Sequence, residues 1–169
     1  MRKISFLITL IVCLSMTAMA QTGSTAPKPN GGGYGYVFFG PGGSVPNGGE
    51  ATMHVGGGGE ALFKNGAGFG AELAYLTPFK YPGDGIGTFS VNGSYHFLKS
   101  SKDGKAVPFL TGGYTGFFRD GYANGVNFGV GVNYWFKPRV GLRFEFRDNI
   151  WVEKEATHFL NARVGLIIR

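Results

Sequence analysis

The chain has 169 residues with a formal net charge of +6, contains 31 glycines and carries a single cysteine, Cys13. This length indicates one domain. A charge this mild, without a run of basic residues, argues against a nucleic-acid partner. The lack of further cysteines excludes a disulfide framework, so an exported form of the chain must gain its stability from a core, a closed sheet or a bilayer.

Residues 1–20 have the three parts of a secretory signal peptide. The basic start MRK is followed by the apolar stretch 4–16 and by Ala18-Met19-Ala20, which fits an A-x-A cleavage site. The apolar stretch is too short to anchor the chain in a membrane. We therefore predict a cleaved signal peptide over residues 1–20, a disordered periplasmic leader over residues 21–32 and one folded domain over residues 33–169.

Eight strand candidates follow at regular spacing, and no helical pattern occurs after the signal peptide. They cover residues 33–40, 51–63, 67–76, 86–98, 107–118, 126–136, 139–146 and 158–169. Proline cannot donate to a sheet ladder, so its positions test these boundaries. The connections contain Pro41, Pro46, Pro78, Pro82 and Pro138, whereas Pro108 falls at a strand start.

Residues 126–146 show the clearest alternation of side chains. One face carries Phe128, Val130, Val132, Tyr134, Phe136, Val140, Leu142, Phe144 and Phe146. The opposite face carries Asn127, Gly129, Gly131, Asn133, Trp135, Gly141, Arg143, Glu145 and Arg147. A period of two over this length predicts a hairpin with one apolar and one polar face. The first candidate, GYGYVFFG, does not alternate cleanly, so its faces stay unassigned.

The connections between these candidates differ in length. Those at residues 64–66, 100–105 and 137–138 are compact and contain lysine, whereas those at 41–50, 77–85, 119–125 and 151–157 are longer. In an up-and-down barrel the two sets lie at opposite ends, and both termini lie with the compact set. Transmembrane barrels have this asymmetry of short inner turns and longer outer loops.

Three stretches carry a resemblance to a known family. They are VPFLTGGYTGFF (residues 107–118), FGVGVNYWFKPRVGLRFEFRD (128–148) and LNARVGLIIR (160–169). With the signal peptide, they resemble the eight-stranded outer-membrane protein A-type barrels of Gram-negative bacteria. The resemblance implies an all-β, antiparallel, up-and-down transmembrane barrel over residues 33–169 in the cell outer membrane, surrounded by lipid and inserted by the barrel-assembly machinery. Such barrels usually end on an aromatic residue, whereas this chain stops at Arg169, on the inward parity.

If the apolar faces meet lipid, a set of ionisable residues faces the lumen. They are Glu60, Glu72, His96, Arg143, Glu145, Arg147 and Arg163. Eight strands enclose an interior that side chains can fill, and buried charges must be paired. We predict a structural network of ion pairs that plugs the lumen, with Arg163 reaching Glu145 on the adjacent strand. A narrow passive pore is the alternative.

Aromatic residues near the predicted strand ends indicate interfacial girdles of a membrane barrel. They are Tyr75, Phe89, Tyr95, Phe97, Tyr134, Phe136 and Trp151. The rival is a soluble, lipocalin-like barrel that binds an apolar ligand, in which the apolar faces would point inward. The closing strand 158–169 should pair with residues 33–40 in either case, because a barrel leaves no edge.

The sequence predicts no enzyme activity and no cofactor. Ser94 and His96 share a face with Glu72 on the neighbouring strand, but this Ser-x-His pair is expected to point into the lumen rather than toward lipid. No histidine has partners at a metal-ligand spacing. A structural or surface-interaction role is expected instead, with residues 77–85 (TPFKYPGDG) and 119–125 (RDGYANG) as candidate loops for a surface ligand.

Overall fold

The computed structural model describes residues 32–45, 49–100, 105–152 and 156–169, so the predicted signal peptide and all but the last residue of the predicted leader lie outside the described residues. Within these ranges no helix is long and apolar enough to span a membrane. The elements are β1 (Gly32–Val45), β2 (Ala51–Leu62), β3 (Ala67–Pro78), the 3-10 turn η1 (Pro82–Asp84), β4 (Ile86–His96), β5 (Ala106–Phe118), β6 (Tyr122–Trp135), β7 (Val140–Trp151) and β8 (Thr157–Ile168).

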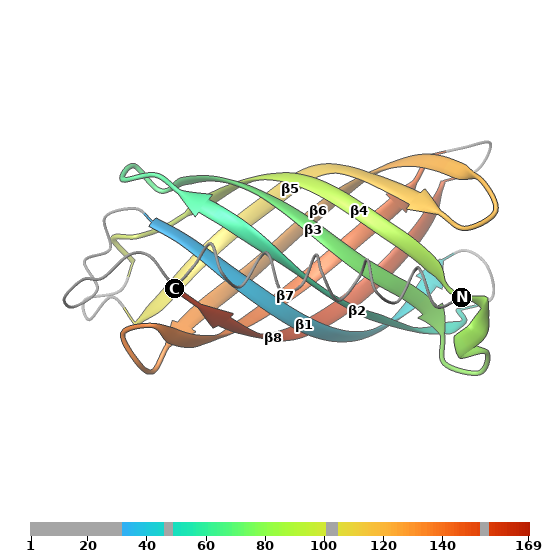
Figure 1. The fold of residues 1–169 in the computed structure, drawn as a ribbon, viewed down its shortest axis with the longest axis horizontal. Coiled ribbons are helices and arrows are strands. Elements are labelled where there is room, and N and C mark those ends of the chain that lie inside the picture. The colour runs from blue at the N-terminus through green and yellow to red at the C-terminus, as the bar shows by residue number, and fades with distance from the viewer. Residues whose placement is uncertain (1–31, 46–48, 101–104, 153–155) are drawn as a thin grey trace, which may run out of the picture.

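The eight strands form one closed antiparallel barrel (Figure 1). Each strand pairs with the next one in the sequence, and β8 pairs with β1 from Ile168 opposite Gly35 to His158 opposite Val45. Every described strand therefore has a neighbour on both sides, which satisfies the backbone donors and acceptors without an open edge. The predicted eight-stranded up-and-down barrel and its closure by the last strand are confirmed.

Side chains alternate between the lumen and the outer wall of the barrel, as the pleat of a strand requires. On β7 the contrast is large, because Arg143 is 3% exposed and the next residue, Phe144, is 45% exposed. On β1, whose faces the sequence left unassigned, Tyr34, Tyr36 and Phe38 are buried in the lumen. The lumen therefore holds large aromatic rings as well as the expected polar side chains.

Strand β1 is longer than predicted, and Pro41 lies inside it rather than in a connection. The pairing with β8 is interrupted at Gly40 and Pro41 and resumes at Gly42, which lies opposite Asn161. Proline has no N–H to donate. Because Pro41 lies where the pairing is interrupted, β8 loses no ladder hydrogen bond. The prediction that all five connection prolines avoid strands was therefore wrong for Pro41 and for Pro78, which is the last residue of β3. Pro46 lies outside the described residues.

Strand β6 begins at Tyr122, within the stretch 119–125 that was predicted to be a loop. Its first residues pair with β5, from Tyr122 opposite Phe118 to Gly125 opposite Thr115, so only residues 119–121 connect the two strands. The connection between β4 and β5, residues 97–105, is longer and lies at the end that was predicted to have compact turns. The predicted length asymmetry is therefore wrong, because backbone pairing extends the strands into polar, glycine-containing segments.

The turn between β2 and β3 follows the prediction more closely. Gly66 has φ of +91°, a left-handed conformation that favours glycine. The Asn65 side chain accepts a hydrogen bond from the Ala67 amide at 3.1 Å, and the Phe63 amide donates to the Ala67 carbonyl at 2.7 Å. Asparagine and glycine together therefore make a tight reversal between the two strands.

Two apolar clusters lie in the lumen, one toward each end. The first contains Tyr34, Tyr36, Phe38, Leu62, Ala74, Val107, Trp135 and Ile167. The second contains Leu76, Phe117 and Ala123, with Ile86, Trp151 and Phe159 packed against them. The first cluster begins at the strand ends nearest the C-terminus, and the second cluster lies at the opposite strand ends. The ionisable residues of the lumen therefore lie between apolar side chains.

Candidate functional site

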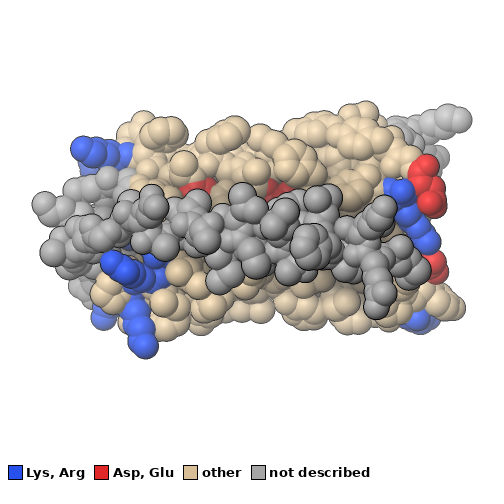
Figure 2. Space-filling model, viewed as in Figure 1, with Lys and Arg blue, Asp and Glu red and all other residues tan. Residues whose placement is uncertain are grey.

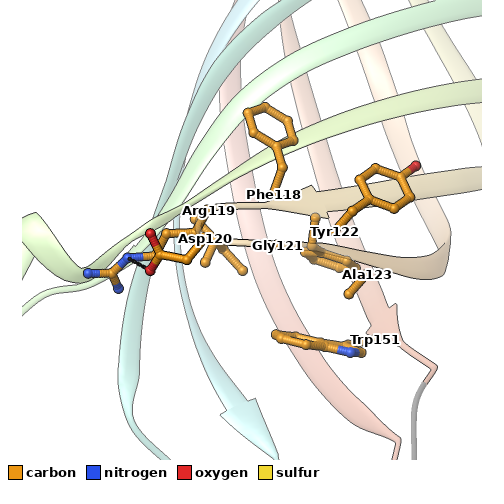
Figure 3. A pocket seen from close by; sticks show the side chains of 9 residues that line it. Phe118, Arg119, Asp120, Gly121, Tyr122, Ala123 and Trp151 are labelled. Carbon is orange, nitrogen blue, oxygen red and sulfur yellow. Dashed lines mark ion pairs between the residues drawn. The ribbon is translucent and has the colours of Figure 1, made fainter. Parts of the chain in front are cut away.

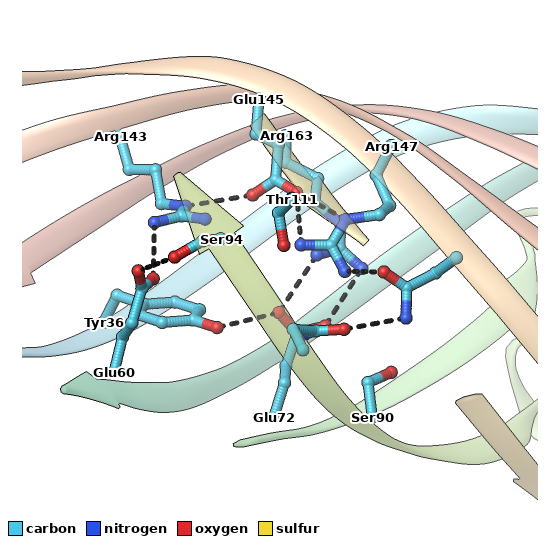
Figure 4. Close-up of polar contacts among 12 residues, drawn as sticks. Tyr36, Glu60, Glu72, Ser90, Ser94, Thr111, Arg143, Glu145, Arg147 and Arg163 are labelled. Atoms are coloured by element: carbon cyan, nitrogen blue, oxygen red, sulfur yellow. Dashed lines mark hydrogen bonds and ion pairs between the residues drawn. The ribbon is translucent and has the colours of Figure 1, made fainter. Parts of the chain in front are cut away.

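The seven ionisable residues predicted to face the lumen all do so. Glu60, Glu72, His96, Arg143, Glu145, Arg147 and Arg163 are buried, and none is more than 8% exposed. They come from β2, β3, β4, β7 and β8, and Figure 4 shows most of them meeting across the lumen. Burial on this scale requires a partner for each charge, and these partners define the candidate site.

Glu60 gathers four groups from three other strands. The Tyr34 hydroxyl donates to its carboxylate at 2.6 Å, and the Ser94 hydroxyl donates to it as well. The Nε2 atom of His96 lies 2.6 Å from the same carboxylate. A guanidinium nitrogen of Arg143 lies 3.6 Å away and also donates to the Tyr34 hydroxyl at 3.2 Å. Glu60 therefore joins β1, β4 and β7 across the lumen.

Glu145 is shared by two arginines of its own strand. Arg143 donates from Nε to Glu145 at 2.9 Å, and Arg147 donates to the other carboxylate oxygen. Arg147 also donates to the Asn127 side chain on β6 at 2.8 Å. The space for this pairing comes from Gly129, where an added Cβ would lie 2.7 Å from a Glu145 oxygen and 2.9 Å from Arg147 Nε.

Arg163 pairs with Glu72, not with Glu145 as predicted. Its two terminal nitrogens lie 3.1 Å from the two Glu72 oxygens, and one of them lies 2.8 Å from Nδ1 of His54. Glu145 is the register neighbour of Arg163 on β7, but it is already engaged by Arg143 and Arg147. The lumen is narrow enough for Arg163 to reach β3 instead.

Aromatic rings line the two arginines that cross the lumen. The guanidinium of Arg143 lies 3.9 Å from the ring centre of Phe109 and 4.8 Å from that of Tyr36. The guanidinium of Arg163 lies 4.1 Å from the ring centre of Phe38. Such cation–π contacts gain strength where the charge is desolvated. Tyr36 also donates its hydroxyl to Glu72 at 3.2 Å.

Sequence reasoning missed several members of this network. His54 lies at even spacing from Glu60 along β2 and shares its face, so strand parity would have placed it in the lumen. Tyr34, Tyr36 and Phe38 could not be placed by pattern, because the neighbouring Val37 and Phe39 are equally apolar. Only closure of β1 against β8 decides which of these side chains turn inward.

The arrangement lacks the geometry of a hydrolytic triad. Ser94 donates to Glu60, and Glu72 is engaged by Arg163 and Tyr36. Nucleophilic catalysis needs the serine hydroxyl in contact with a base that a third group orients, and the described contacts do not join Ser94 to His96. No group of three His, Cys, Asp or Glu residues that could hold a metal ion occurs in the described part of the chain.

A shallow pocket of about 330 Å³ lies at the end of the barrel opposite the C-terminus (Figure 3). It is lined by Ile86, Phe117, Phe118, Arg119, Asp120, Gly121, Tyr122, Ala123 and Trp151. Arg119 joins its rim to the preceding loop, because it donates to the Asp84 carboxylate at 3.1 Å and to the Asp84 carbonyl at 2.9 Å. Of the two predicted surface loops, only residues 79–85 and 119–121 remain outside strands.

The outer wall of the barrel is apolar. Figure 2 shows mostly uncharged residues along the visible wall, with Lys and Arg only toward the two ends and small acidic patches between them. Of the predicted aromatic girdle, Tyr75, Phe89, Tyr95, Phe97, Tyr134 and Phe136 are exposed on this wall. Trp151 was wrongly included. It shares the inward parity of Arg147 on β7 and stacks on Phe117, with ring centres 5.7 Å apart.

Solved structures of small outer-membrane barrels have a similar fold. Neisserial surface protein A superposes with a TM-score of 0.63 and 16% sequence identity, over 80% of this chain and 96% of that one. The N-terminal barrel domain of Pseudomonas aeruginosa OprF gives a TM-score of 0.56 at 12% identity, over 82% and 100%. Ail, the attachment invasion locus protein of Yersinia pestis, gives 0.56 at 11% identity, over 82% and 98%.

No protein-family profile and no curated protein matches the sequence. The similarity to these structures is one of fold, and it confirms the resemblance that the sequence predicted. In fold, the chain is therefore similar to small outer-membrane β-barrels, and its outer wall is apolar.

Proposed function

We propose that the protein is a structural and surface-interaction barrel of the outer membrane, whose own side chains close its lumen to solutes. The observation that carries this proposal is the lumen network, in which three arginines meet three glutamates between two apolar clusters. Eight strands leave an interior that side chains can fill. Charges paired this closely are held by several contacts each, which favours a fixed plug over a hydrated path.

The outer wall supports placement in a membrane. Large apolar side chains are exposed on the barrel, among them Val37, Phe69, Leu110, Val130 and Phe146. A contiguous apolar surface of this extent is unfavourable in water and matches the lipid-facing band of transmembrane barrels. The lipocalin-like rival requires the reverse, with apolar side chains inside and charges outside.

Conductance and labelling test this proposal together. We expect no sustained conductance after reconstitution in planar bilayers, whereas large, stable channels would contradict the plugged lumen. Cysteines placed singly at Leu142 and Arg143 test the placement of the wall. A spin label at position 142 should report lipid and one at position 143 should not. The reverse pattern would support the lipocalin-like rival.

A second candidate function, binding of a surface ligand, rests on the pocket at the loop end. Arg119 ties the 119–121 connection to Asp84 in the preceding loop, which gives the aromatic pocket a fixed rim. One structural neighbour is named for attachment and invasion, and loops on a rigid scaffold are common binding sites. We propose that any surface partner binds at this end.

Loop replacement tests the second candidate. Residues 79–85 and 119–121 would be exchanged for Gly/Ser linkers of equal length, and proteoliposomes carrying either form would be applied to cultured epithelial cells. We expect the exchanged barrel to insert normally and to lose attachment. Attachment that is equal for both forms would contradict this function without affecting the plugged-barrel proposal.

A further inference from the structure

The two ends of the barrel differ in charge. At the end where β8 finishes, the described connections carry five exposed cations, which we call the basic collar: Lys64, Lys99, Lys105, Lys137 and Arg139. The described parts of these connections, residues 63–66, 97–100, 105 and 136–139, contain no Asp or Glu. No ion pair is found for the five cations within the described part of the chain.

The opposite end has a mixed charge. Glu50, Asp84 and Asp120 lie there with Lys80 and Arg119, and Arg119 is paired with both neighbouring aspartates, at 3.1 and 3.7 Å. In Figure 2 the end at the left shows only blue charged groups, whereas the end at the right shows blue and red together. Among the described residues, cations without acidic neighbours are therefore concentrated at the collar, although Lys80 at the opposite end has no ion pair either.

Outward aromatic rings set the depth of the collar. Phe63 precedes Lys64, Phe97 lies two residues before Lys99, and Phe136 precedes Lys137. The three rings are exposed on the outer wall at the strand ends. Aromatic rings of membrane proteins sit at the headgroup level, and each of these lysines follows its ring in the turn beyond the strand end. Lysine side chains extend further toward the polar layer, so their ammonium groups lie at the level of the lipid phosphates.

We propose that the basic collar binds the phosphate groups of anionic phospholipids in the leaflet that surrounds this end of the barrel. The collar takes its cations from three connections, β2–β3, β4–β5 and β6–β7, which are spread around the circumference. This spacing suits several separate headgroups rather than one enclosed phosphate ion. The inference rests on the membrane placement proposed above and adds a lipid partner to it.

Lipid selectivity measured by electron spin resonance tests the collar. The barrel is reconstituted in phosphatidylcholine vesicles, and the association of spin-labelled phosphatidylglycerol is compared with that of spin-labelled phosphatidylcholine. We expect phosphatidylglycerol to be favoured roughly 2–5-fold, and high salt to reduce this ratio. Replacing all five collar cations by Gln should bring the ratio to about one.

Matched variants separate the collar from general charge effects. Replacing the four collar lysines by Arg keeps the charge and should keep the selectivity, and Lys80→Gln at the opposite end should leave it unchanged. A ratio of one for the unaltered barrel, or an unchanged ratio after the Gln replacements, overturns the proposal.

Faster migration of unboiled samples on gels reports insertion independently of lipid selectivity. Insertion without selectivity contradicts the collar alone. Failure to insert in either lipid contradicts the membrane placement itself, and the collar with it.

Discussion

The inner and outer walls of β7 and β8 are built from the same two strands and follow different rules. On the outer wall Leu142, Phe144 and Val164 need only be apolar, because lipid accepts many shapes. On the inner wall Arg143, Glu145 and Arg163 each need named partners at bonding distance. A substitution on the outer wall should therefore act through hydrophobicity and depth in the bilayer, whereas one on the inner wall should act through the partner that it leaves unpaired.

Glu145→Leu is expected to have the largest effect on the inner wall. It removes the carboxylate that Arg143 and Arg147 share, so two buried cations lose an acceptor at once. Breaking one buried pair costs about 3–5 kcal/mol, so the free energy of unfolding in urea should fall by that amount or more. Phe146→Leu, the outward control on the same strand, should change it by about 0.5 kcal/mol or less. Equal losses would contradict the comparison.

Arg163→Leu should lower the free energy of unfolding by about 3–5 kcal/mol, because Glu72 then lies buried without its cation. Adding Glu72→Leu should restore most of the loss, since replacing a whole buried pair by apolar residues is often neutral. Urea titration of the single and double variants measures both effects. If Glu145→Leu restored stability and Glu72→Leu did not, the Arg163–Glu72 pairing would be wrong.

Val164→Arg tests the outer wall. Val164 lies near the middle of β8, and Leu166 lies nearer the strand end. An arginine facing lipid at mid-depth costs about 2–4 kcal/mol, and one near the interface about 0–1 kcal/mol. Val164→Arg should therefore reduce stability and insertion more than Leu166→Arg, as measured by unfolding in vesicles and by the fraction that migrates as folded barrel. The opposite order would contradict the depth assigned to this strand.

Gly129→Ala tests how tightly the inner wall is packed. The added methyl group would press on Glu145 and Arg147 at 2.7 and 2.9 Å, so overpacking should cost about 1–3 kcal/mol. Gly93→Ala is the control, because its nearest atom would lie 3.9 Å away. The midpoint of thermal unfolding should be lower for Gly129→Ala than for Gly93→Ala. Equal midpoints would mean that Glu145 and Arg147 can move aside without loss of stability.

Asp84→Ala should have the smallest effect. It removes the ion pair with Arg119 that ties two loops together outside the barrel, where both side chains are exposed. An exposed pair contributes about 0–1 kcal/mol, and salt should reduce even this difference. Urea titration at low and high salt measures it. A loss comparable to that of Arg163→Leu would show that the loops hold the barrel together.

Alternation along the strands was enough to predict which residues lie in the lumen. Arg143, Glu145 and Arg147 appear on one side of a run whose other side is apolar, and a period of two allows only two faces. The same parity, applied to β2 and to the end of β7, would have placed His54 and Trp151 inside as well. It could not decide β1, where both faces are apolar or glycine.

Ion-pair partners and strand ends were beyond sequence reasoning. Arg163 has Glu145 beside it in the register and nevertheless binds Glu72 across the lumen, because the bond depends on the width of the closed barrel and on which acceptors are already occupied. The sequence predicted Tyr122 and Gly125 as loop residues, yet their backbones pair with β5. Backbone groups form sheet hydrogen bonds wherever the neighbouring strand extends far enough.

Local patterns in the sequence were enough to predict the class of fold, the number of strands and the side of the wall on which each ionisable residue lies, and they also contain the three lysines that follow outward aromatic rings. These properties are local, because each depends on a period of two or on adjacent residues. The closed barrel was needed to show that β1 turns its tyrosines inward, that Glu60 contacts side chains of three other strands, and that Arg163 pairs with Glu72. Those contacts join residues far apart in the chain, and closure of the barrel is what brings them together.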